Sequence, residues 1–126
     1  MIGSSPLIPM LPASDLERAK KWYADNLGLT PVSEDPGGVE YETGGTRFSV
    51  YASEFAGTAQ NTAAGFEVAD ARATIAELSA KGVVFEDYDL PDLKTDADHV
   101  AEMGPFVGGW FKDSEGNILS VMSKSS

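Results

Sequence analysis

Hydrophobic and polar positions alternate with two different periods along this chain, and the whole arrangement occurs twice. The apolar side chains of residues 16–27 recur every three or four positions, which predicts an amphipathic helix. Residues 71–81 have the same spacing and predict a second helix. The two apolar stripes consist of Leu16, Ala19, Tyr23 and Leu27 in the first stretch and Ala71, Ile75 and Leu78 in the second.

Both predicted helices have the same residue types at their ends. Asp15 precedes the first helix and Asp70 the second, and an aspartate there accepts hydrogen bonds from free backbone N–H groups. Gly28 and Gly82 follow the last turns, where glycine readily takes the left-handed conformation that ends a helix. The repeated caps support two equivalent structural units.

The segments after each helix have the alternation and the β-branched and aromatic residues of strands. With an apolar strand before each helix, each half reads βαβββ. We therefore expect one domain, 1–126, with module one at about 5–56, a linker at about 57–61 and module two at about 62–126. The predicted strands after the helices are 29–34, 38–43 and 47–53 in the first half and 83–89, 106–112 and 117–123 in the second.

The stretch DSEGN, from Asp113 to Asn117, predicts the tip of a β-hairpin. It suits a three-residue loop in which Gly116 takes the left-handed position. This register pairs Trp110 with Ser120, and side chains opposite each other share a face of the sheet. Gly108 and Phe106, two and four residues before Trp110, then lie on the same face.

Composition narrows the classes of partner. The chain has 126 residues, 42% of them hydrophobic, which is enough for one domain with a core. Twenty acidic against nine basic side chains give a net charge of −11, which opposes binding to nucleic acid and to anionic membranes. Cysteine is absent, no apolar run is long enough to span a membrane, and the start lacks the basic residues of a secretory signal. We expect a cytoplasmic protein.

The stretches ASDLERAKKWYADNLGL, GFEVAD and WFKDSEGNIL, within two βαβββ units, resemble the vicinal oxygen chelate superfamily, the glyoxalase/bleomycin resistance protein/dioxygenase group. The resemblance covers nearly the whole chain. It implies an α+β fold in which two pseudo-symmetric βαβββ modules form an eight-stranded, cup-shaped sheet. It also implies a homodimer, because single-domain members pair by exchanging or abutting modules.

Metal-using members of this family place three or four ligands in the cup, usually histidines and glutamates. The matching positions here are Ile8, Ala63 and Ser120, with Ser49 where some members add a carboxylate on strand four. Isoleucine and alanine cannot coordinate an ion, and a serine hydroxyl is a weak ligand. The sequence therefore predicts a member without the usual metal centre and without a cofactor.

The segment Asp87–His99 holds five aspartates and the only histidine of the chain. Oxygen ligands at this density attract Ca²⁺ or Mn²⁺, but the segment lacks the glycine and the distal glutamate of an EF-hand loop. The pattern favours an acidic, solvated loop. In the family such a loop can lie over the mouth of the cup as a lid, from which His99 can donate a hydrogen bond to a ligand.

Further candidates come from the predicted strand faces. Tyr51 shares a face with Ser49, and Glu42 and Glu67 are possible carboxylate bases, although acids on strands are more often exposed. Trp22 lies beside the apolar stripe and suits a subunit interface. The expected ligand-binding residues are Ser49, Tyr51, Phe106, Trp110, Ser120 and His99.

Two functional classes remain open on these grounds. The first is a metal-independent protein that holds an aromatic or drug-like molecule in the cup, where an acidic rim suits cationic or polar aromatic compounds. The alternative is an enzyme of the family, a lyase, an isomerase or a dioxygenase-like protein. It would use acid–base residues or a non-standard metal site near Asp96–His99.

Overall fold

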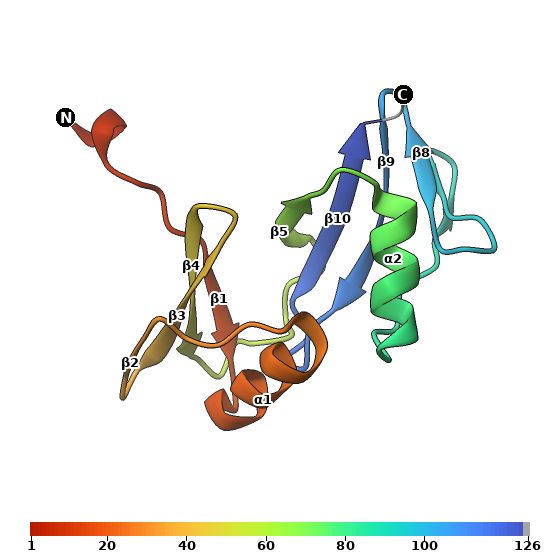
Figure 1. The fold of residues 1–126 in the computed structure, drawn as a ribbon. Helices are drawn as coiled ribbons and strands as arrows, with labels where there is room; N and C mark the ends of the chain where they lie inside the picture. Colours follow the sequence, from red (N-terminus) through yellow and green to blue (C-terminus); the bar gives the residue numbers. More distant parts are fainter. Residues whose placement is uncertain (125–126) are drawn as a thin grey trace.

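The computed structural model describes residues 1–124 as an α+β protein with two helices and two four-stranded sheets (Figure 1). The predicted class is confirmed. Within one chain the eight strands are divided between two separate sheets. Among the described residues, no helix is both long and apolar enough to cross a membrane.

The first sheet has the strand order β1-β4-β3-β2. β1 runs parallel to β4, and the other neighbours are antiparallel. A short 3-10 turn, Ile2–Ser4, precedes this sheet, and the N-terminal segment extends away from it (Figure 1). The strands are β1 (Met10–Ala13), β2 (Ser33–Asp35), β3 (Gly38–Thr43) and β4 (Thr46–Ala52).

The second sheet repeats this topology with the order β5-β10-β9-β8. β5 runs parallel to β10, as β1 does to β4. A separate two-stranded hairpin, β6 (Asp89–Leu90) and β7 (Leu93–Lys94), precedes β8. The strands of the sheet are β5 (Thr62–Glu67), β8 (Ala101–Met103), β9 (Phe106–Lys112) and β10 (Ile118–Lys124).

Both helices form where the sequence predicts them, α1 at Leu16–Leu27 and α2 at Ala71–Ala80. The Asp15 carboxylate accepts from the Arg18 N–H at 3.0 Å, and Asp70 accepts from the Ala73 N–H at 3.1 Å. Gly28 has φ 68° and Gly82 has φ 103°, so glycine supplies the left-handed conformation after each helix. The local capping signals were therefore sufficient to place both helices.

The predicted strand over 83–89 is wrong. Only Phe85 bridges to β9, opposite Phe111, and the chain then leaves the edge of the sheet. β8 pairs with the other end of β9, where Ala101 lies opposite Gly108. Two separate segments, around Phe85 and at β8, thus pair with β9 at this edge of the sheet. The acidic insertion between them forms the separate hairpin of β6 and β7.

The predicted strand over 29–34 is also shorter, because its first residue belongs to the end of α1. The Leu29 N–H donates to the Tyr23 carbonyl at 3.1 Å, closing the last turn. The Val32 N–H donates to the Glu40 carbonyl at 2.8 Å, and β2 proper begins at Ser33. The predicted strand 38–43 coincides with β3.

One hydrophobic core spans both halves of the chain, on the helix-facing sides of the two sheets. Tyr23, Tyr41 and Phe111 are completely buried in it. The Tyr23 and Tyr41 rings stack with centroids 5.3 Å apart, and Trp22 stacks on Phe111 at 6.0 Å. Trp22 therefore packs between the two halves of the same chain, and the core fixes α1 against both sheets.

The tip of the β9–β10 hairpin completes the N-terminus of α1. Gly116 has φ 87°, as the loop requires, and Trp110 lies opposite Ser120, so the predicted register is confirmed. The buried Glu115 carboxylate accepts from the Asp15 N–H at 3.0 Å and from Arg18 Nε at 2.7 Å. The hydrogen bond and charge of Arg18 lower the pKa of Glu115 from 4.5 to about 2.

Asp113 forms a second connection at this tip. Its carboxylate accepts from the Tyr23 hydroxyl at 2.7 Å and from the Asn117 side-chain amide at 2.9 Å. The same amide nitrogen donates to the Pro12 carbonyl at 2.9 Å. Burial first, and then the Asp113 charge, raises the pKa of the Tyr23 phenol. The two halves of the chain are thus joined by a buried polar network as well as by the core.

Candidate functional site

The candidate site lies on the face of the second sheet that turns away from α2. Gly109 faces the helix, since a methyl group there would lie 3.0 Å from the Ile75 side chain. Leu119 and Val121 belong to the core on that same side. Side chains alternate along strands, so Trp110 and Ser120 point to the opposite face.

A cavity of about 810 Å³ opens on this opposite face. Two thioethers and two aromatic rings supply its apolar walls, and its polar groups are two hydroxyls, one carboxylate and one ammonium group. Thioether side chains are flexible and polarizable, so they can adapt to ligands of different shape. Its lining includes Gly65, Glu67, Met103, Phe106, Ser120, Met122 and Lys124.

The floor of the cavity depends on close packing between β5 and β10. Gly65 lies beside Ser120 in the parallel register. A methyl group at position 65 would lie 2.3 Å from Ser120 Oγ, a distance at which the two atoms collide. Only glycine at position 65 leaves the Ser120 hydroxyl its observed place in the cavity.

Trp110 does not line this cavity, because other side chains cover it. It forms a small cluster with Ala101 and Ile118 and is only 8% exposed. The Tyr88 ring, from the insertion before β8, packs edge-on against the indole with centroids 5.4 Å apart and an interplanar angle of 77°. Leu93 also packs on this cluster. The indole therefore supports a covering side chain and does not form an open wall.

Ser49 and Tyr51 lie on the other sheet. Val50 between them is fully buried in the core, so Ser49 and Tyr51 point to the face of the first sheet that turns away from the core. Met10 lies opposite Ser49 in the sheet and Pro12 opposite Tyr51. Neither Ser49 nor Tyr51 is among the residues that line the cavity of the second sheet.

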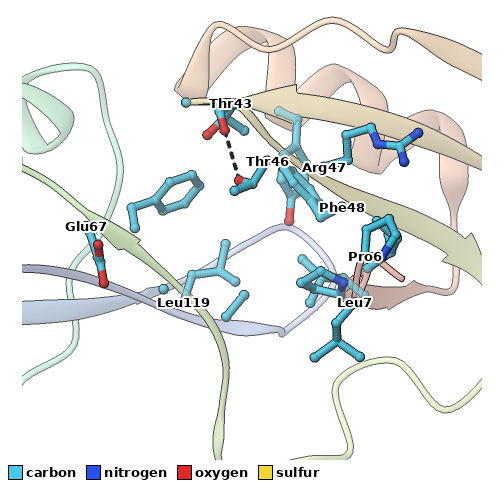
Figure 2. A pocket seen from close by; sticks show the side chains of 17 residues that line it. Pro6, Leu7, Thr43, Thr46, Arg47, Phe48, Glu67 and Leu119 are labelled. Carbon is cyan, nitrogen blue, oxygen red and sulfur yellow. Dashed lines mark hydrogen bonds between the residues drawn. The ribbon is translucent and has the colours of Figure 1, made fainter. Parts of the chain in front are cut away.

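The space between the two sheets forms a groove of about 640 Å³, which adjoins the cavity at β5, where Gly65, Phe66 and Glu67 line both. Its walls are helix-facing side chains such as Leu11 and Phe48 of the first sheet and Leu119 of the second, with the N-terminal segment at one side. Figure 2 shows this arrangement, with Phe48 and Leu119 on opposite sides and the Thr43–Thr46 hydrogen bond at the β3–β4 turn. The groove thus lies on the core-facing sides of the sheets.

His99 lies apart from the other predicted ligand-binding residues. Its Nδ1 is 2.7 Å from Asp87 Oδ1, and its carbonyl packs close to Gly109 on the α2 side of the sheet. Arg72 of α2 binds Asp96 at 2.9 Å, which with two backbone N–H donors lowers the pKa of Asp96. The structure brings Phe106 and Ser120 together at one cavity and places His99 elsewhere.

The positions that match the family's metal ligands do not fit a divalent ion. Ile8 lines the groove between the sheets, Ala63 is exposed on β5, and Ser120 lies in the cavity. None supplies a carboxylate or an imidazole. Within residues 1–124, no group of three or more His, Asp or Glu side chains is placed to hold a metal. Of the candidate bases, Glu67 lines the cavity and Glu42 is exposed on β3.

Sequence reasoning missed several residues of the site. Met122 follows Ser120 by two positions, so strand alternation alone could have placed it on the same face. Gly65 and Met103 enter the cavity through pairings that only the folded sheet defines. Tyr88 was included in an acidic loop, and no local signal indicates that its ring returns to cover Trp110.

Comparisons with known proteins agree on one family. A family model described as the Glyoxalase/Bleomycin resistance protein/Dioxygenase superfamily matches residues 8–121. No curated protein matches the chain.

Solved structures with a similar fold include a bleomycin-binding protein from bleomycin-producing Streptomyces verticillus complexed with copper(II)-bleomycin, at 23% identity and TM-score 0.74 over 99% of this chain and 100% of that one. A glyoxalase family protein from Enterococcus faecalis has 18% identity and TM-score 0.71 over 97% and 99% of the two chains. Lactoylglutathione lyase from Agrobacterium tumefaciens has 18% identity and TM-score 0.65 over 95% and 93%. At these identities the likeness concerns the fold.

Proposed function

The chain belongs to the glyoxalase/bleomycin resistance protein/dioxygenase superfamily, and from this premise we propose that it binds an aromatic or drug-like small molecule without using a metal ion. The observation that carries the proposal is the cavity of about 810 Å³ on the second sheet. Its size falls in the usual range for small-molecule sites, roughly 300–1,000 Å³. At the family's ligand position it presents the Ser120 hydroxyl in place of a metal-binding carboxylate.

The chemistry of the cavity indicates the kind of ligand. Met103, Phe106 and Met122 offer thioether and aromatic surface, which suits a planar apolar ring. Glu67 and Lys124 both line the cavity, so its lining carries one charge of each sign, while the whole chain carries a net charge of −11. The field of the whole chain favours a cation over an anion, so we expect an aromatic ligand with a basic group.

We also propose that two copies of the chain complete the site. Ser49 and Tyr51 face outward on the first sheet, while Phe106 and Ser120 face the cavity of the second. β1 and β5 are edge strands, and such strands readily pair with another chain. A homodimer that joins the first sheet of one copy to the second sheet of the other would build the eight-stranded cup from two half-sites.

One neighbour adds support. The Streptomyces verticillus protein of the same fold is a bleomycin-binding protein. The geometry does not favour the alternative of an enzyme centred on Asp96–His99. Asp96 forms an ion pair with Arg72, and the His99 ring is hydrogen-bonded to Asp87. A cytoplasmic location stays a prediction.

Native mass spectrometry of the freshly purified protein, before and after EDTA, is the first test. We expect a dimer whose mass does not change with EDTA, with or without a bound organic molecule. A stoichiometric divalent ion that EDTA removes would contradict metal-independent binding, and a monomer would contradict the shared cup.

Calorimetric titration with tryptamine, a cationic compound with two fused rings, tests the cavity itself. Phe106→Ala removes a cavity wall that is 44% exposed, and we expect about tenfold weaker binding. Phe55→Ala is the matched control, since Phe55 is 69% exposed in the turn after β4 and does not line the cavity. Equal affinity in both variants, or no binding to the unaltered protein, would refute the proposed site.

A further inference from the structure

We infer that Tyr88 determines which ligands fit, because its ring covers the part of the second sheet, next to the cavity, into which a longer ligand would extend. This inference rests on the proposed function. We name residues 87–100, the insertion that includes β6 and β7, the strap. Tyr88 lies near the start of the strap, on the same face of the second sheet as the cavity.

Hydrogen bonds within the strap and an ion pair to α2 fix its backbone. The Tyr88 N–H donates to Thr95 Oγ1 at 2.9 Å, and the Thr95 N–H donates to the Tyr88 carbonyl at 2.9 Å. Arg72 of α2 binds Asp96 at 2.9 Å. These bonds fix the backbone beside Tyr88, so the ring has a defined position.

The cavity and the strap share a boundary. Met103 and Met122 line the cavity and also pack on the cluster that contains Trp110 and receives Tyr88. The cavity lies on one side of these two thioethers, and the Trp110 indole covered by the Tyr88 ring lies on the other. We therefore place the end of the site at Met103 and Met122, next to Tyr88.

Next to Trp110 the sheet carries only small residues. Gly108 and Ala101 lie opposite each other in β9 and β8, and neither has a side chain that fills the space above the sheet. Met122 leans over Gly108, since a methyl group at position 108 would lie 2.3 Å from the Met122 sulfur. Removing the Tyr88 ring would leave a ring-sized space next to a side chain that can move, and would join that space to the cavity.

Two cationic amines of different length test whether removal of the Tyr88 ring lengthens the site. Tryptamine is compact, whereas biphenyl-4-ylmethanamine carries the same kind of charged group on two rings joined in line. We expect Tyr88→Ala to tighten binding of the biphenyl amine about tenfold and to change tryptamine affinity by less than about twofold. Leu90→Ala is the matched control, because Leu90 lies in the same strap and is 55% exposed.

A second readout does not depend on any ligand. In a Trp22→Phe background, Trp110 is the only tryptophan, and its burial predicts weak quenching by acrylamide. Tyr88→Ala should raise the quenching constant about threefold, the order expected when a buried ring gains solvent contact, while Leu90→Ala should leave it unchanged. Tyr88→Leu, which keeps an apolar side chain at the site, replaces the alanine variant if circular dichroism shows that the latter is unfolded.

The outcomes separate this inference from the proposed function. Increased quenching together with selective tightening of the biphenyl amine supports the role of Tyr88. Unchanged quenching, or equal changes for both amines, overturns it even if tryptamine binds the unaltered protein. If neither amine binds any variant, the proposed function fails, and the claim that Tyr88 determines ligand length fails with it, whereas the quenching result still reports whether the ring covers Trp110.

Discussion

Glu115 and Arg18 lie 97 residues apart in the sequence and are joined by two hydrogen bonds, from Arg18 Nε to Oε2 at 2.7 Å and from Nη2 to Oε1 at 3.0 Å. The carboxylate is buried at the tip of the β9–β10 hairpin, whereas the guanidinium is half exposed on α1. The same carboxylate also accepts from the Asp15 N–H at the start of the helix. One side chain of the second half thus completes the first helix of the first half.

Replacing this carboxylate should destabilise the whole chain. Glu115→Gln removes the charge and one acceptor while keeping the shape, and we expect the free energy of unfolding to fall by about 1–3 kcal/mol. Urea unfolding followed by circular dichroism measures the change. Glu77→Gln is the control, because its pair with Lys81 at 3.7 Å is exposed and should contribute little. Equal effects of the two changes would contradict a special role for Glu115.

The contribution of Glu115 should depend on pH in a defined window. Its pKa is lowered from 4.5 to about 2, so the folded state favours the ionised form. The resulting stability is fully present above pH 4.5 and is lost as the pH falls towards 2. The difference in unfolding free energy between the natural chain and Glu115→Gln should therefore shrink across this range. A difference that stays constant down to pH 2 would show that the charge is not responsible.

Two buried tyrosines should respond in opposite ways to loss of the hydroxyl. The Tyr23 hydroxyl donates to Asp113, so Tyr23→Phe should cost about 1–2 kcal/mol of unfolding free energy. The Tyr41 hydroxyl is buried without a hydrogen-bond partner among residues 1–124. Tyr41→Phe should be neutral or stabilising by up to about 1 kcal/mol. Thermal unfolding of both variants checks this, and a larger loss from Tyr41→Phe would contradict the hydrogen-bond assignment.

A pair of substitutions should reveal the close contact in the cavity floor. Gly65→Ala places a methyl group against Ser120 Oγ, and we expect it to lower the unfolding free energy by about 1–3 kcal/mol. Ser120→Ala removes that oxygen, so the double variant should regain most of the loss. A double-mutant cycle in urea measures the coupling. Additive losses would mean that the strain comes from another contact.

Mixing two defective chains tests whether each site uses two copies. Chains with Tyr51→Ala and chains with Phe106→Ala are each expected to bind tryptamine weakly. If a site joins the first sheet of one copy to the second sheet of another, random heterodimers restore about a quarter of the sites. Calorimetry reports this fraction.

The control for this mixing experiment pairs two defects on the same sheet. Phe106→Ala and Met122→Ala both lie on the second sheet, so every mixed site keeps one defect and binding should not return. No recovery with Tyr51→Ala and Phe106→Ala would place each complete site within a single chain.

The elements whose ends or register are set by nearby residues could be predicted from the sequence. Asp15 and Gly28 define the ends of α1 within its own sequence, and the turn around Gly116 sets the register of Trp110 and Ser120. The strand over 83–89 could not be judged in this way, since its pairing depends on how an insertion divides the edge of β9. A β-rich stretch forms a strand only where the sheet offers a free edge.

The candidate site was predictable only in part, because its geometry depends on long-range contacts. The pattern placed Phe106 and Ser120 on one face correctly. It did not show that Ser49 and Tyr51 belong to a different sheet of the same chain. Nor did it show that Tyr88 covers Trp110, because that contact requires the strap to fold back across the sheet.

The polar network at the hairpin tip affects how the chain folds during its synthesis. Residues 1–56 contain every strand and the helix of the first sheet, yet the Asp15 N–H and the Tyr23 hydroxyl find their partners only at the hairpin tip, on Glu115 and Asp113. During synthesis these two groups therefore have no hydrogen-bond partner until the hairpin tip at residues 113–117 has been made. Truncation before the final hairpin should leave both halves unfinished, so proteolysis in the cell would remove incomplete chains as whole units.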